Sequence, residues 1–229
     1  MKKYQVIILA VVLTFNLQLL TFNCFSAEKG LVLHFKFDEG SGDTVKDASG
    51  SGFEGAVNGE VSWGEGVSGK AISFDGTSFV DVPYDDRLAP EKLVTILAWI
   101  NPTDYEFDSY KNIVICWDSY ILRYDNPPEG GKFSFFIFLE GSPEPRVQLD
   151  APALKKWHLV AGIWDGKKSY VYVDGQKQSI DRPGSPAPKE STFHIGEGYV
   201  GAIDELKIYN RVLTDDELKA ALAAGPKAK

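Results

Sequence analysis

Four aromatic residues lie in a stretch of chain whose composition suits contact with a sugar. Tyr105 and Tyr110 belong to the segment TDYEFDSYKN, Trp117 belongs to CWDSY, and Tyr124 belongs to LRYDN. Aromatic rings offer apolar faces on which a pyranose ring can stack, and nearby Asp, Asn or Arg side chains can hydrogen-bond to its hydroxyl groups. We therefore predict that these four rings bind a ligand. The alternative is that some of them pack in the core.

A carboxylate near the C-terminus raises a different question. The segment YVGAIDELKIYN alternates like a strand, and the alternation places Asp204 on the same face as Ala202, Leu206 and Ile208. That face is mostly apolar, so we predict that it points inward. A buried charge without a partner is costly, and Asp204 therefore needs a cation or several hydrogen-bond donors.

The N-terminal segment has the pattern of a secretory signal peptide. Two lysines precede a long apolar run, and small residues follow it at Ser26 and Ala27. We predict cleavage after residue 27, which makes the protein secreted, with an extracellular, cell-surface or periplasmic location. Two alternatives stay open: an uncleaved membrane anchor, and lipidation of Cys24.

The bulk composition restricts the class of partner. Without the two lysines of the leader, the formal net charge changes from -8 to -10. Such an acidic chain argues against nucleic acid and anionic membranes as partners. With Cys24 in the leader, Cys116 has no other cysteine with which to pair, so no disulfide is expected to stabilise the core.

The rest of the chain is predicted to be almost entirely strands and turns. Short segments rich in β-branched and aromatic residues follow one another, and Asp-Gly pairs after Trp164 and Val173 indicate hairpins. This pattern predicts an all-β fold with one domain over residues 28–224. One helix is predicted after Thr214, because Glu217 completes a capping box, and a short tail follows at 225–229. The main predicted strands cover 31–38, 93–101, 112–117, 120–124, 132–139, 156–164 and 169–173.

Five segments, in order along the chain, resemble one known family. They are FKFDEGSGDTVKDASGSGFEGAV, GKAISFDGTSFVDVP, VTILAWINP, WHLVAGIWDGKKSYVYVDGQ and YVGAIDELKIYNRVLTDDEL. In them the chain resembles laminin-G-like jelly-roll domains, which are also called concanavalin A-like lectin/glucanase domains. The resemblance implies a sandwich of two antiparallel, curved sheets. It does not determine the function, because this fold serves lectins, adhesion modules and glycanases alike.

The resemblance also implies a structural calcium ion. Proteins of this architecture often bind one where the first and last strands meet, and the matching positions are Asp38 and Asp204. Asp47 lies in the loop that follows the first strand and is a further candidate ligand. Calcium favours such carboxylate and carbonyl oxygens. The alternative is that these carboxylates accept hydrogen bonds from backbone N–H groups.

The resemblance provides no sign of catalysis. Glycanases of this fold commonly carry a Glu-x-Asp-x-x-Glu pattern, but here Glu106 and Asp108 are followed by Lys111 at the third position. We therefore predict a secreted, non-catalytic module that binds carbohydrate and holds a structural calcium. An adhesion or structural module that binds extracellular protein is the alternative, and a glycoside hydrolase is a further one.

Overall fold

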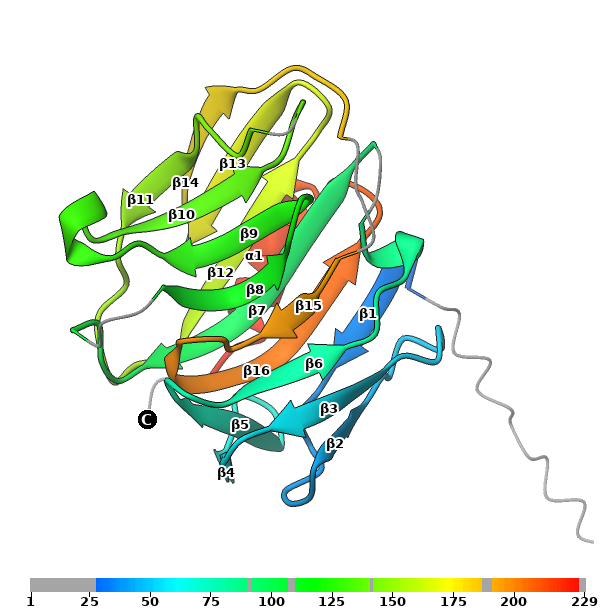
Figure 1. Ribbon diagram of the computed structural model, residues 1–229, viewed down its shortest axis with the longest axis vertical. Helices are drawn as coiled ribbons and strands as arrows, with labels where there is room; N and C mark the ends of the chain where they lie inside the picture. The colour runs from blue at the N-terminus through cyan, green and yellow to red at the C-terminus, as the bar shows by residue number, and fades with distance from the viewer. Residues whose placement is uncertain (1–27, 90–91, 107–109, 141, 187–190, 227–229) are drawn as a thin grey trace, which may run out of the picture.

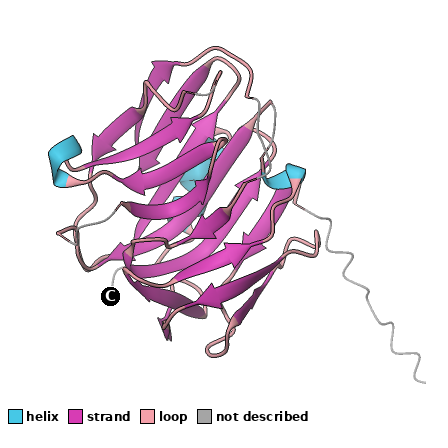
Figure 2. Cartoon of the chain, viewed as in Figure 1, coloured by secondary structure: helices cyan, strands magenta, loops and turns pink. Residues whose placement is uncertain are grey.

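Two antiparallel sheets packed face to face form the protein, as the sequence predicted (Figures 1 and 2). The computed structural model describes residues 28–89, 92–106, 110–140, 142–186 and 191–226, so the predicted signal peptide lies outside the described residues. Sheet A has the order β14-β13-β12-β7-β16-β5-β4, with β1 paired to β16. Its strands are β1 (Leu31–Phe35), β4 (Ser62–Glu65), β5 (Lys70–Asp75), β7 (Val94–Pro102), β12 (His158–Trp164), β13 (Lys168–Val173), β14 (Gln176–Asp181) and β16 (Val200–Tyr209).

Sheet B has the order β11-β10-β9-β8-β15-β6-β3-β2. Its strands are β2 (Thr44–Lys46), β3 (Glu54–Asn58), β6 (Phe79–Val82), β8 (Lys111–Cys116), β9 (Tyr120–Tyr124), β10 (Lys132–Ile137), β11 (Val147–Asp150) and β15 (Phe193–Ile195). Alternate residues of both sheets meet in one apolar core between them, as Leu122, Phe133 and Phe135 do. Because side chains alternate along a strand, the residues between them point away from that core. Two short 3-10 turns cover Asp86–Leu88 and Pro127–Glu129.

A bulge in β16 changes the phase of the last strand. The pairing with β7 shifts between Asp204 and Lys207, and Glu205 has a φ of 49°. The predicted alternation was therefore wrong at Ile203 and Asp204, although it held for Leu206 and Ile208. Ile203 packs in the central core, and Asp204 points to the other face of sheet A, because an extra residue in a bulge reverses the alternation.

The two outer faces of the sandwich differ. Helix α1 (Asp215–Ala223), which begins at the predicted capping box, covers the outside of sheet A (Figure 1). Its Leu218 belongs to the same apolar cluster as Trp99 and Tyr172 of that sheet. No helix among the described residues has the length and apolar character needed to cross a membrane. We call the outer face of sheet B the open face; it carries Arg123, Ser134 and the apolar cluster of Ile115, Ile121, Phe136 and Phe138.

Candidate functional site

Two of the four predicted ligand-binding rings are accessible. Tyr110, directly before β8, is 44% exposed, and Trp117, directly after β8, is 46% exposed. The strand between them has six residues, so the two rings stand at opposite ends of it, roughly 20 Å apart. They are therefore not part of one small binding pocket.

The other two rings stack on each other, Tyr124 within the core and the half-buried Tyr105 against it. Tyr124 is only 8% exposed and stacks on Tyr105, with ring centroids 4.0 Å apart. The hydroxyl of Tyr105 donates to the carbonyl of Pro152 at 3.0 Å, and burial, with Tyr124 beside it, raises the Tyr105 pKa. Burial of Tyr124 argues against its predicted ligand role, whereas Tyr105 is half-buried and its ligand role stays a prediction. Leu122 and Tyr124 lie on the same side of β9, and both point into the core. The alternation of side chains along β9 therefore already disfavoured Tyr124 as a ring that stacks on a sugar.

A row of polar side chains crosses four strands of the open face. Asn112 on β8 pairs with Arg123 on β9, Arg123 pairs with Ser134 on β10, and Ser134 pairs with Gln148 on β11. Asn112, Arg123 and Ser134 are all buried, and Gln148 is half-buried. Buried polar groups need partners, so this row demands a hydrogen-bond network.

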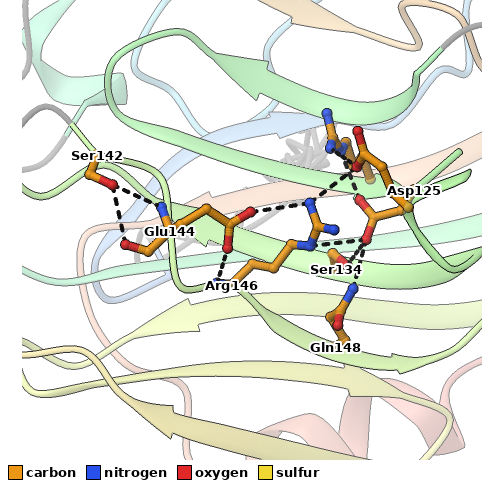
Figure 3. A network of polar contacts seen from close by, with 8 residues as sticks. Asp125, Ser134, Ser142, Glu144, Arg146 and Gln148 are labelled. Carbon is orange, nitrogen blue, oxygen red and sulfur yellow. Dashed lines mark hydrogen bonds and ion pairs between the residues drawn. The ribbon is translucent and has the colours of Figure 1, made fainter.

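Asp125 is the centre of that network (Figure 3). Its carboxylate is fully buried and accepts from Arg123 Nε at 2.9 Å, from Gln148 Nε2 at 3.0 Å and from the hydroxyl of Ser134. Arg146 Nε approaches the same carboxylate at 3.4 Å. Two guanidinium groups are therefore fixed in orientation by one buried carboxylate.

Two glutamates complete the ion pairs. Glu129 Oε2 lies 2.7 Å from Arg123 Nη2 and 3.1 Å from Arg146 Nη1, and Glu144 Oε1 lies 3.2 Å from Arg146 Nη1. We call Arg123, Asp125, Glu129, Glu144 and Arg146 the charged network. Each of its carboxylates is paired with a guanidinium, which suits a role in orienting side chains rather than in proton transfer.

Tyr110 contacts the charged network on one side and is exposed to solvent. Its ring lies on the Arg123 guanidinium, with the Arg123 Cζ 4.1 Å from the ring centroid, and Phe136 lies 4.6 Å from the same Cζ. An aromatic ring with a guanidinium behind it is held in place by cation–π attraction. An exposed, oriented ring beside fixed polar groups is an arrangement that can bind a sugar.

Sequence reasoning found only part of this site. It identified Tyr110 and noted an arginine and an aspartate beside Tyr124, but it missed Glu129, Arg146 and Gln148. Arg146 and Gln148 join the site only through the pairing of β10 with β11, and no local pattern reports that pairing. Trp117 is exposed, but no contact among the described residues links it to the charged network. Its predicted ligand role is untested, and a site confined to the charged network would not include it.

The predicted calcium ligands lie in two separate places. Asp204 and Asp38 both contact the loop between β4 and β5: Asp204 accepts from the N–H groups of Val67 (2.7 Å) and Ser68 (3.1 Å), and Asp38 accepts from that of Lys70 (2.9 Å). Asp47 instead accepts five backbone N–H groups, from His34, Ser49, Ser51, Gly52 and Phe53. The structure thus brings together two of the three candidates.

The donor sets around these carboxylates do not fit a calcium ion. Asp204 Oδ1 also accepts from the N–H of Glu205 at 2.8 Å, so three N–H groups point at one carboxylate, and an N–H group repels a cation. Burial raises the Asp204 pKa to about 6, against the hydrogen bonds from Ser68 and Val67 that lower it. No group of three or more His, Cys, Asp or Glu side chains within the described ranges could hold a metal. Calcium binding stays a prediction, and this geometry argues against it.

Removal of divalent cations tests whether a bound calcium ion stabilises the protein. We expect an excess of EDTA to leave the melting temperature of the purified protein unchanged, because Asp204 and Asp47 already accept hydrogen bonds from backbone N–H groups. Differential scanning calorimetry with EDTA, and then with added Ca²⁺, measures it. A fall with EDTA that Ca²⁺ reverses would restore the calcium prediction.

Comparison with known proteins agrees with the fold. A family model described as the concanavalin A-like lectin/glucanases superfamily matches residues 74–219. No curated protein matches the sequence. Domain 4 of AbnA, an extracellular arabinanase from Geobacillus stearothermophilus, solved in complex with arabinotriose, is 22% identical with a TM-score of 0.66, covering 86% of this chain and 99% of that domain.

Two toxin domains have the same fold. The binding domain of Paraclostridial Mosquitocidal Protein 1 is 15% identical (TM-score 0.67), and the match covers 84% of this chain and 52% of that one. The ligand-binding domain of botulinum neurotoxin serotype D, in complex with N-acetylneuraminic acid, is also 15% identical (TM-score 0.67), with 85% and 50% covered. The chain thus spans about half the length of these two domains. At such low identity the similarity establishes the fold alone.

Proposed function

The chain belongs to the concanavalin A-like lectin/glucanases superfamily, and from this membership we propose that it is a secreted, non-catalytic module that binds carbohydrate through the open face of sheet B. The observation that carries the proposal is the exposed ring of Tyr110, held on Arg123 beside the charged network. Similar structures titled as binding domains, one of them in complex with arabinotriose, support a binding role.

The chemistry of the open face supports binding over hydrolysis. A glycosidase needs one carboxyl group that gives up a proton and another that attacks or activates water. Asp125 is fully buried and bonded to Arg123, Ser134 and Gln148, and Glu129 is shared between two arginines. These carboxylates already accept hydrogen bonds from guanidinium, hydroxyl and amide groups, which suits fixed acceptors and not a general acid.

Replacement of one ring tests the proposal. We expect Tyr110→Ala to weaken glycan binding by about five- to thirtyfold, since stacking on one aromatic ring contributes roughly 1 to 2 kcal/mol. The stability should change little, because the ring is nearly half exposed. A glycan array followed by isothermal titration calorimetry against the best ligand measures the effect.

Trp117→Ala is the matched control, because it removes an equally exposed ring at the other end of β8. We expect it to leave the affinity within about twofold, a difference of less than about 0.5 kcal/mol. Loss of binding in Trp117→Ala alone would move the site away from the charged network. Absence of any glycan ligand for the wild-type protein would favour the protein-binding alternative.

A further inference from the structure

The charge balance of the open face restricts the class of sugar that it can bind. We infer that the site selects uncharged glycans and discriminates against glycans that carry carboxylates, such as uronates and sialylated sugars. This inference rests on the proposed carbohydrate binding and specifies its ligand.

Both guanidinium groups of the charged network are already paired with carboxylates of the protein. The Arg123 guanidinium is paired with Asp125 and Glu129 and lies between the rings of Tyr110 and Phe136, and its side chain is only 9% exposed. Arg146 approaches three carboxylates within 3.4 Å, those of Asp125, Glu129 and Glu144. A ligand carboxylate would have to displace one of these protein carboxylates to form its own ion pair.

The charges nearest to the solvent are negative. The side chains of Glu129 and Glu144 are 28% and 52% exposed, compared with 19% for Arg146. Two cations and three anions give the network a formal charge of -1, and the whole region after the leader is strongly acidic. An incoming carboxylate therefore meets like charges at close range, where they are only partly screened.

The remaining polar atoms suit hydroxyl groups. Within the described residues the network uses only Oε2 of Glu129 and Nε2 of Gln148, so the Oε1 atoms of both side chains remain as acceptors. The network engages Nε and Nη1 of Arg146 and leaves Nη2 as a donor. A hydroxyl group both donates and accepts, whereas a carboxylate only accepts. This mixture of donors and acceptors matches a neutral sugar.

Matched pairs of glycans test the inference. We would immobilise lactose beside sialyllactose, methyl-esterified pectin beside polygalacturonate, and xylan beside glucuronoxylan, and measure binding of the wild-type protein to each. In the pair that contains a ligand, we expect the acidic member to bind at least about tenfold more weakly. We also expect its binding to strengthen with added NaCl while that of the neutral member stays constant, because salt screens repulsion.

A variant without the two glutamate charges tests whether they cause the discrimination against acidic glycans. We expect Glu129→Gln/Glu144→Gln to reduce the discrimination at least about fivefold by improving binding of the acidic member. The matched control is Asp181→Asn/Asp216→Asn, which removes two well-exposed carboxylates on β14 and α1, away from the open face, and should leave the discrimination unchanged.

The outcomes separate the two proposals. Equal or tighter binding of the acidic member to the wild-type protein overturns the inference and leaves carbohydrate binding standing. Absence of binding to either member of every pair overturns carbohydrate binding, and the inference with it. If the glutamine variant fails to fold, the salt dependence of the wild-type protein still decides the inference.

Discussion

Asp204→Ala is expected to lower the free energy of unfolding by about 3 kcal/mol, since the N–H groups of Val67, Ser68 and Glu205 each lose their fully buried acceptor. For a domain of this size that loss lowers the melting temperature by roughly 10 °C. The loop between β4 and β5 should lose its attachment to β16, and its amide protons should exchange faster. Urea denaturation and hydrogen exchange measure the two effects.

Asp38→Ala is the matched control for this prediction. Asp38 contacts the same loop, but it is exposed and, within the described part of the chain, accepts from one backbone N–H group, that of Lys70. Asp38→Ala should therefore lower the free energy of unfolding much less than Asp204→Ala does. Equal losses in the two variants would contradict the assignment, and a loss that EDTA reproduces in the wild-type protein would return both residues to a metal site.

The contribution of Asp204 to the stability of the fold decreases as the pH rises. Its folded-state pKa of about 6 lies above the unfolded value of 3.8, so the folded protein holds the proton more tightly. This contribution to stability is fully present below pH 3.8 and is lost as the pH rises through 6. Wild-type protein should therefore gain about 1 kcal/mol relative to Asp204→Ala when the pH falls from 7.5 to 5.

The fold was predictable because its signals are local. Alternation of apolar residues identified the strands, and Thr214 with Glu217 located the helix start. The prediction for β16 failed at one point, where the bulge at Glu205 reverses the phase of Asp204. A bulge is set by the fit of β16 against β7, β5 and β1, which no short segment of sequence contains.

The site was less predictable because its residues meet through pairing between strands. Tyr110 stood out as an aromatic residue in a loop, but the same reasoning chose Tyr124, which the phase of β9 places in the core. Glu129 and Arg146 are 17 residues apart and become neighbours only when β10 and β11 pair. Composition can suggest that a segment binds sugar, whereas only the register shows which of its side chains share a face.

Asp125→Ala is the other substitution from which we expect a large effect. It removes from Arg123, which is almost fully buried, the fully buried carboxylate 2.9 Å from its Nε, and it weakens the hold on Arg146. Removal of one partner from a buried ion pair typically costs 3 to 5 kcal/mol, so we expect a loss of about 4 kcal/mol in the free energy of unfolding. Asp150→Ala, which removes an exposed carboxylate on the neighbouring strand β11, should leave the stability within experimental error.

An apolar replacement of the same cluster separates stability from function. If the loss in Asp125→Ala comes from unpaired buried charge, Arg123→Met/Asp125→Leu/Arg146→Met should recover much of it. The carboxylates that then lose their arginines, those of Glu129 and Glu144, are partly exposed to solvent. Glycan binding should not return, since Tyr110 would lose the guanidinium on which it rests. Recovery of both properties would show that the charged network is dispensable for binding. Recovery of stability alone would show that these buried charges serve to orient the open face.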